Sequence, residues 1–174
     1  MKEIKLFLTD IDGVWTDSGM YYDNEGNELK KFTTSDSAGV LFLRMLDIPV
    51  GIITGENANI VARRAKKLGI DLLFMGVRNK LAVVEKICKE KQIGLDEVAY
   101  LGDDIIDIPV LQAVGLSAVP AMVPDYVEKH AKWVLTKKGG QGVFREFVEK
   151  YLREQGLLDK AIELYLAKVK SSSF

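Results

Sequence analysis

Short apolar runs alternate with longer amphipathic stretches along most of this 174-residue chain. Such runs, bounded by polar or turn residues, are typical of strands buried on both faces of a sheet. We predict strands at residues 4–8, 50–53, 72–74, 98–101 and 116–119, with a weaker one at 133–135. Helical spacing of apolar residues predicts helices at 35–46, 57–68, 80–91 and 107–113. This alternation favours an α/β fold, a Rossmann-like parallel sheet sandwiched by helices.

Two parts of the chain depart from the alternation. Residues 20–32 hold two β-prone runs around Asp23-Asn24-Glu25-Gly26, which predicts a β-hairpin projecting after the first strand, within residues 18–33. Residues 143–153 and 157–169 predict closing helices, the second within a helical tail at 156–174. We expect residues 1–174 to form a single domain, because this length suits one core.

Composition narrows the classes of function. With 24 Lys and Arg against 25 Asp and Glu, the net charge is −1, so the basic excess of nucleic-acid or membrane-surface proteins is missing. One cysteine, Cys88, and one histidine, His130, disfavour disulfides and histidine-rich metal sites. No apolar stretch approaches the ~20 residues that cross a bilayer, and no leader pattern is visible. We therefore expect a cytoplasmic protein with neither nucleic-acid nor membrane partners.

Polar side chains follow the predicted strands, at the edge where open α/β sheets bind ligands. Asp10 and Asp12 follow the first strand, and this spacing suits a nucleophilic carboxylate beside a carboxylate acting as acid and base. An ordinary Asx turn is the alternative. Thr54 and Gly55 follow the second strand, where a hydroxyl and backbone N–H groups can bind an anion. A simple helix cap is the alternative there.

Further acids and a lysine complete this pattern. Asp103, Asp104 and Asp107 follow the fourth strand, and clustered carboxylates repel one another unless a cation lies among them. Oxygen ligands without histidine favour Mg²⁺ over Zn²⁺. Lys80 begins a predicted helix, where the dipole disfavours a cation, so it is a candidate anion ligand; a surface lysine is the alternative.

In this order and at these places, the motifs resemble the haloacid dehalogenase-like phosphatase superfamily over residues 5–149. The resemblance implies that Asp10 is the nucleophile, forming an aspartyl-phosphate, and that Asp12 protonates the leaving alcohol and then activates water. It implies that Thr54 and Lys80 hold the transferring phosphoryl group. Mg²⁺ would be held by Asp10, Asp103 and the backbone carbonyl of Asp12, and the site would be supported by Asp104 and Asp107.

The spacing of the motifs leaves no room for a lid. Asp12 and Thr54 are 42 positions apart, and Thr54 and Lys80 are 26 apart. The hairpin and the predicted helices and strand fill these gaps, so neither holds an extra domain of about 50 residues. We therefore expect a haloacid dehalogenase-like fold with a projecting hairpin and no cap domain.

This combination resembles the cap-less branch that acts on 2-keto-3-deoxy sugar acid phosphates. The resemblance is carried by residues 10–17, by residues 35–39, and by Gly139-Gly140-Gln141-Gly142 before Arg145. It implies a small-molecule sugar-acid phosphate as substrate. It also implies a homotetramer in which hairpins pack together and neighbouring subunits complete each active site.

The substrate stays open between two sugar acids. In the branch acting on 3-deoxy-D-manno-octulosonate 8-phosphate (KDO 8-phosphate), Arg usually stands where this chain has Glu56, after Gly55. Glu56, with Arg64 and Lys67 on one helix face, looks more like the branch acting on 2-keto-3-deoxynononate 9-phosphate (KDN 9-phosphate). An acid at a helix N-terminus beside a solvated basic face is the alternative. Arg145 is a further candidate for a substrate carboxylate.

Two other classes of protein share parts of the pattern. A receiver domain also uses Asp, Thr, Lys and Mg²⁺, but needs adjacent acids after the first strand and its phosphorylated Asp after the third, which ends here in Phe74-Met75-Gly76. A catalytically silent regulatory or assembly domain is the second alternative. Against it stands the intact set of Asp10, Asp12, Thr54, Lys80 and Asp103.

Overall fold

The computed structural model describes residues 2–171 and has the predicted α/β architecture. Its main sheet is six-stranded and parallel, in the order β5-β4-β1-β6-β7-β8. The strands are β1 (Leu6–Thr9), β4 (Val50–Ile53), β5 (Leu72–Phe74), β6 (Val98–Leu101), β7 (Leu116–Val119) and β8 (Trp133–Val134). All were predicted from their apolar runs, because strands covered on both faces read as continuous apolar sequence.

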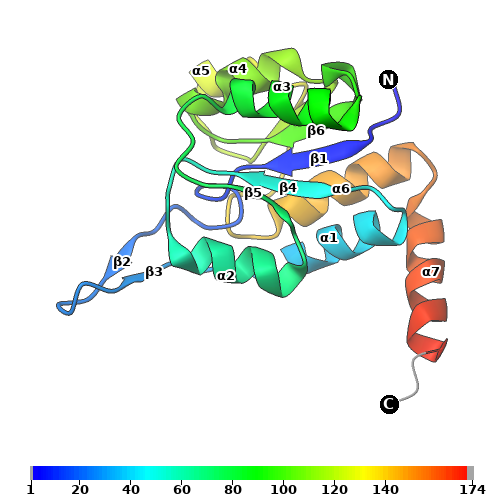
Figure 1. The fold of residues 1–174 in the computed structure, drawn as a ribbon, viewed down its shortest axis with the longest axis horizontal. Helices are drawn as coiled ribbons and strands as arrows, with labels where there is room; N and C mark the ends of the chain where they lie inside the picture. The colour runs from blue at the N-terminus through cyan, green and yellow to red at the C-terminus, as the bar shows by residue number, and fades with distance from the viewer. Residues whose placement is uncertain (1, 172–174) are drawn as a thin grey trace.

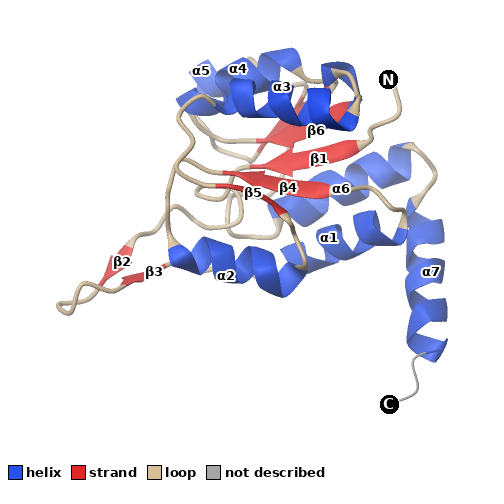
Figure 2. Cartoon of the chain, viewed as in Figure 1, coloured by secondary structure: helices blue, strands red, loops and turns tan. Residues whose placement is uncertain are grey.

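Helices cover both faces of the sheet (Figures 1 and 2). On one face lie α1 (Asp36–Met45), α2 (Asn59–Leu68) and α6 (Val143–Glu154). On the other lie α3 (Lys80–Lys91), α4 (Ile108–Ala113) and α5 (Asp125–Glu128). Side chains of β1 alternate between the two layers: Phe7 packs in the core beneath α1 and α6, and Leu6 and Leu8 pack in the core beneath α3 and α4. The remaining helix, α7 (Leu158–Ser171), packs against α1.

Local structure differs from the predictions at two helix starts. The helix expected at 57–68 begins at Asn59, because Ala58 is extended and residues 55–58 form a loop. The helix expected from 107 is preceded by a 3₁₀ turn, Ile105–Asp107, whose first N–H is accepted by the Asp104 side chain. Neither α5 nor a second 3₁₀ turn, Leu95–Glu97, was predicted, since such short pieces show no helical period.

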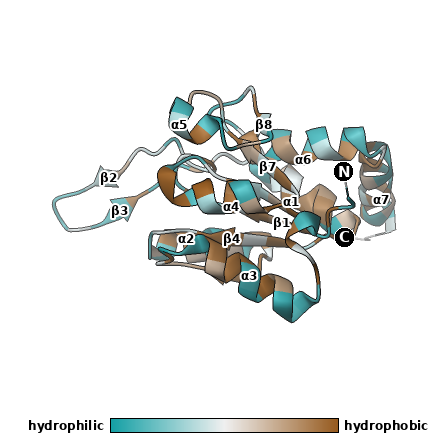
Figure 3. Ribbon diagram, turned by 90° about the horizontal axis from the view of Figure 1, so that it is seen from above, coloured by the Kyte–Doolittle hydropathy of each residue, from teal (hydrophilic) through white to brown (hydrophobic). Residues whose placement is uncertain are grey.

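The predicted hairpin consists of β2 (Tyr21–Tyr22) and β3 (Glu28–Leu29), paired antiparallel. It projects from the body at the end opposite α7 in both views (Figures 1 and 3). Within residues 2–171 no second folded unit lies over the carboxyl edge of the sheet, so the cap-less architecture is confirmed. Of the helices described, none has both the length and the apolar character needed to cross a bilayer.

Candidate active site

The ends of β1, β4 and β6 bring the predicted residues to one edge of the sheet. These strands are neighbours, with β1 in the middle, and the Asp10 N–H donates to the Leu101 carbonyl at 2.9 Å. Thr54 follows β4, and Asp103 lies two residues after β6. Lys80 reaches the same place from the first residue of α3.

The Lys80 side chain is completely buried between two carboxylates. Its Nζ lies 2.6 Å from Oδ2 of Asp10 and 2.7 Å from Oδ1 of Asp107. Burial by itself lowers the pKa of Lys80, but the charges of Asp10 and Asp107 outweigh it and raise that pKa above its ordinary value. A permanent positive charge therefore lies against Asp10.

Asp107 orients this site. Its Oδ1 accepts hydrogen bonds from Lys80 and from the Tyr100 hydroxyl. Its Oδ2 accepts from the backbone N–H groups of Asp103 and Asp104, at 2.9 and 3.1 Å. A carboxylate has about four acceptor positions, so protein donors fill those of Asp107. Tyr100 was not among the predicted site residues, because inside an apolar strand it reads as core.

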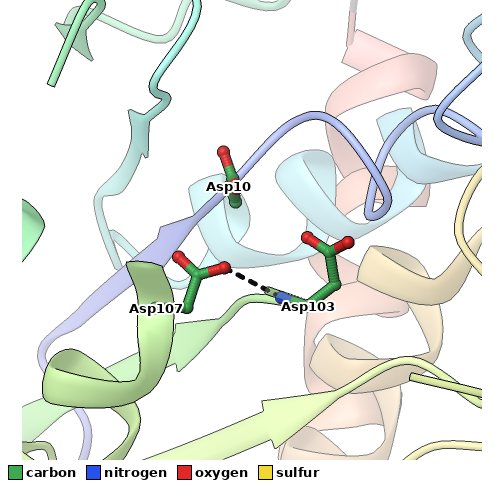
Figure 4. A group of neighbouring side chains, drawn as sticks. All are labelled: Asp10, Asp103 and Asp107. Atoms are coloured by element: carbon green, nitrogen blue, oxygen red, sulfur yellow. Dashed lines mark hydrogen bonds between the residues drawn. The ribbon is translucent and has the colours of Figure 1, made fainter. Parts of the chain in front are cut away.

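Asp10, Asp103 and Asp107 form a group of carboxylates in which one oxygen from each residue lies within 4.8 Å of the others (Figure 4). Burial, with repulsion from the neighbouring carboxylates, raises the pKa of Asp10 to about 7 and that of Asp103 to about 8. Oδ1 of Asp103 is buried and has no hydrogen-bond partner among the described residues. A divalent cation would offset this repulsion, and the all-oxygen donor set fits Mg²⁺.

Gly13 lets the loop after β1 approach Asp103 closely. Its φ is +79°, and a Cβ built on it would lie 1.8 Å from Oδ2 of Asp103. Any larger residue would therefore displace the Asp103 carboxylate, whose Oδ1 has no hydrogen-bond partner among the described residues. The glycine of the Asp-x-Asp-Gly sequence thus has a steric role at the candidate metal site.

Asp12 has different partners from Asp10. Its Oδ2 lies 2.6 Å from Nζ of Lys30, and its Oδ1 accepts from the Thr16 hydroxyl at 3.2 Å. Lys30 follows β3 and its side chain is fully buried. Neither Lys30 nor Thr16 was predicted as a site residue, because their approach to Asp12 depends on the path of the hairpin.

The phosphate-binding candidates after β4 lie in a loop. Thr54 is buried, and its hydroxyl accepts from the Glu56 N–H at 3.3 Å. Gly55 and Glu56 are exposed at the edge of the sheet. Because α2 begins only at Asn59, the anion donors available here are loop N–H groups and the Thr54 hydroxyl, not the first turn of a helix.

Within residues 2–171, the contacts of the basic specificity candidates are to groups other than Asp10. Arg64 donates to a backbone carbonyl in the loop before α1 and to the Ser37 hydroxyl, both at 3.0 Å. Arg145 pairs with Glu149 on α6 at 2.6 Å. Lys67 is exposed on α2. Roles for these residues in substrate binding remain predictions.

A pocket of about 340 Å³ opens beside Asp103. The loops after β1 and β7 line it together with the segment that holds Lys138 and Gln141. A larger pocket, of about 500 Å³, lies at the opposite edge, around Pro49 and Ile70 before β4 and β5. We regard the smaller pocket as the functional one, because Asp103 and Gly13 belong to its wall.

Comparison with known proteins identifies the family of this chain. Residues 52–147 match the family of haloacid dehalogenase-like hydrolases. The chain belongs to this family. Among characterised hydrolases it is 39% identical over 160 residues to the Escherichia coli K12 3-deoxy-D-manno-octulosonate 8-phosphate phosphatase KdsC, covering 92% of this chain and 85% of that protein. The Haemophilus influenzae enzyme of the same name is 36% identical over 156 residues, 90% of this chain and 87% of that one.

Solved structures of haloacid dehalogenase-like hydrolases superpose closely on this one. A probable YrbI family phosphatase from Pseudomonas syringae matches with a TM-score of 0.90 at 44% identity, covering 95% of this chain and 94% of that one. The Moraxella catarrhalis 3-deoxy-D-manno-octulosonate 8-phosphate phosphatase, in complex with magnesium, phosphate and KDO, matches with a TM-score of 0.89 at 34% identity and 93% coverage of both chains. The predicted family and fold are confirmed, and the match agrees with a magnesium-dependent site.

Proposed function

We propose that this protein is a Mg²⁺-dependent phosphatase that hydrolyses the phosphate monoester of a 2-keto-3-deoxy sugar acid. The observation that carries the proposal is the buried contact between Asp10 and Lys80, beside the partnerless oxygen of Asp103. It supports the proposal because a candidate nucleophile, a positive charge and a candidate metal ligand lie side by side, as phosphoryl transfer through a carboxylate requires. The names of the relatives support the substrate class.

In the proposed reaction, a carboxylate oxygen of Asp10 attacks phosphorus while the ester P–O bond breaks. The leaving oxygen takes a proton from Asp12, which becomes a carboxylate. In the second half, Asp12 takes a proton from water, whose oxygen attacks phosphorus while the bond between phosphorus and the Asp10 oxygen breaks. Inorganic phosphate leaves, and both side chains return to their starting states.

The remaining residues hold the phosphoryl group in this proposal. Lys80 and the Thr54 hydroxyl neutralise and orient its equatorial oxygens, where charge spreads during transfer. Asp10, Asp103 and the backbone carbonyl of Asp12 would hold Mg²⁺, which supplies further neutralisation of phosphate charge when bound. Asp107, through its contacts to Lys80 and to two backbone N–H groups, keeps these groups in place.

Phosphate release with Mg²⁺ tests the function directly. We expect the wild type to release phosphate from KDO 8-phosphate or KDN 9-phosphate and Asp10→Asn to release none. Asp71→Asn, at an exposed aspartate near the opposite edge of the sheet, is the matched control and should keep wild-type activity. A wild type that released phosphate from neither compound would favour a catalytically silent regulatory or assembly domain.

Within the substrate class we propose KDN 9-phosphate as the preferred compound. Glu56 is exposed at the edge where the substrate would enter, and a carboxylate can accept hydrogen bonds from the additional hydroxyl of the nononate. The relatives named for KDO 8-phosphate favour the shorter sugar acid. The ratio of kcat/KM for the two compounds, measured in wild type and in Glu56→Arg, decides which compound is preferred and whether Glu56 selects it. An unchanged ratio in the variant would remove Glu56 from substrate selection.

We further propose a homotetramer in which neighbouring subunits cover the open edge. Four large apolar side chains of the hairpin are exposed: Met20, Tyr21, Tyr22 and Leu29. Exposed apolar surface of this kind is typical of sites where proteins contact one another. In the proposed tetramer, Arg64, Lys67 and Arg145 of one subunit would reach the active site of a neighbouring subunit. Light scattering should report a tetramer, and a variant with residues 20–29 replaced by a short turn should dissociate. Dissociation without any change in substrate preference would contradict a shared active site.

A further inference from the structure

The Lys30 side chain is completely buried although the residue follows a hairpin that projects into solvent. Its neighbours Leu29 and Lys31 are both exposed, because alternate residues of an extended segment point to opposite sides. Lys30 therefore points inward, to the base of the hairpin, and meets the loop that follows β1.

At the base of the hairpin, the Lys30 ammonium lies 2.6 Å from Oδ2 of Asp12 and 3.6 Å from Oε1 of Glu28. A buried ammonium is strongly unfavourable unless acids accompany it, so these contacts explain its position. The other Asp12 oxygen accepts from the Thr16 hydroxyl at 3.2 Å. Both oxygens of Asp12 are thus held by side chains from the segment between β1 and α1.

We propose that Lys30 is a positioning residue that holds the Asp12 carboxylate in the orientation needed for proton transfer. This inference rests on the proposed function, in which Asp12 is the acid and base. The Lys30 side chain has no exposed surface with which to bind a substrate arriving from solvent. Asp12 itself is 26% exposed and precedes Gly13, so without its partners its side chain would be free to adopt other rotamers.

The position of Asp12 matters in both halves of the reaction. The proton must pass first from Asp12 to the leaving oxygen and later from water to Asp12. Each transfer requires the Asp12 oxygen within hydrogen-bond reach of the reacting oxygen. Loss of Lys30 leaves the Asp10–Lys80 contact unchanged, so phosphate binding survives while proton transfer slows. The expected signature is a lower kcat with little change in KM.

The test compares Lys30→Met with Lys31→Met, the exposed neighbour, using KDO 8-phosphate and p-nitrophenyl phosphate with Mg²⁺. We expect Lys30→Met to lower kcat for KDO 8-phosphate about 10–100-fold, a part of the usual acid–base contribution, with KM changed less than about threefold. p-Nitrophenolate leaves without a proton, so Lys30→Met should still release a rapid first equivalent of it before slow turnover. Lys31→Met should behave as wild type.

A double-mutant cycle with Asp12→Asn separates positioning from a structural role. If Lys30 acts through Asp12, Lys30→Met should add no further loss in the Asp12→Asn background. Additive losses, or a raised KM with unchanged kcat, would overturn the inference. Should Lys30→Met fail to fold, Lys30→Gln, which also removes the ammonium group from Asp12 but keeps a polar side chain, carries the same test. A wild type inactive on these two compounds and on KDN 9-phosphate would refute the proposed function itself, and the role of Lys30 with it.

Discussion

The Lys80 ammonium lies 2.6 Å from Oδ2 of Asp10, and both side chains are buried. The contact is reinforced by Asp107, which is equally buried and lies 2.7 Å from the same ammonium. Two acids and one base in a buried cluster depend on one another more strongly than surface ion pairs do. The arrangement therefore has consequences for the stability of the protein.

Replacing Lys80 with methionine should destabilise the metal-free protein. The substitution leaves Asp10 and Asp107 buried without a cation, and breaking a buried pair in this way typically costs about 3–5 kcal/mol. Lys86→Met, in the same helix but 69% exposed, is the matched control and should change stability by less than about 0.5 kcal/mol. Urea unfolding at pH 7.5 measures both, and equal stabilities for Lys80→Met and wild type would contradict the buried-cluster account.

Magnesium binding should strengthen as pH rises from 6 to 8. A carboxylate must lose its proton to bind a metal, and in the metal-free protein the pKa of Asp10 is about 7 and that of Asp103 about 8. Protons therefore compete with Mg²⁺ at pH 6, and we expect affinity to fall more than about tenfold between pH 8 and pH 6. Calorimetry in buffers of different ionisation enthalpy should also detect proton release. Constant affinity without proton release would rule out protonated ligands.

Substitution of Gly13 with alanine should disrupt the candidate metal site specifically. Gly13 and Gly26 both have positive φ, +79° and +84°, so alanine strains the backbone at either position. Only at Gly13 would the new Cβ meet a carboxylate, whereas nothing lies within 4 Å of the corresponding position at Gly26. We expect Gly13→Ala to weaken Mg²⁺ binding more than about tenfold, because a displaced ligand costs at least about 1.4 kcal/mol of binding free energy. Gly26→Ala should leave Mg²⁺ binding unchanged. Equal effects would point to backbone strain alone.

The sequence predicted those parts of the site that depend on strand order. Asp10, Thr54 and Asp103 follow strands that pair side by side in a parallel sheet, so their meeting follows from the fold class. Lys80 was predicted because a cation at a helix start is unusual. The fold class could also be predicted, because the spacing of apolar residues in strands and helices is a local property of the chain.

Contacts that depend on the path of a loop could not be predicted in this way. Lys30 and Asp12 are 18 residues apart in the sequence, and they contact each other only because the chain returns to the end of β1 after the hairpin. Tyr100 lies in an apolar strand, and its hydroxyl becomes informative only when Asp107 is placed beside it. The late start of α2, at Asn59, follows from the extended conformation of Ala58, which the apolar pattern does not report.

The Asp36 carboxyl group should make the free energy of unfolding of the wild type fall as the pH rises. The Asp36 side chain is fully buried at the start of α1. Its Oδ1 accepts a hydrogen bond from the backbone N–H of Arg145 at 3.0 Å, and its Oδ2 has no hydrogen-bond partner among the described residues. Burial raises the pKa of Asp36 from 3.8 to about 6. The folded state thus holds this proton more tightly than the unfolded state does. Its contribution to stability is complete below pH 4 and is lost as pH rises through 6.

Asp36→Asn removes this dependence, because an amide does not ionise but still offers an oxygen to the Arg145 N–H. Relative to the variant, wild type should lose about 1–1.5 kcal/mol of unfolding free energy between pH 5 and pH 8, as linkage requires for this shift. The sign follows from the raised pKa: charging a buried carboxylate favours the unfolded chain. Urea unfolding at both pH values measures the difference, with Asp71→Asn as the exposed control. A wild type that gained stability relative to Asp36→Asn over this interval would show that the Asp36 carboxylate is stabilised as an anion, through Arg64 and the α6 N-terminus, contrary to the burial argument.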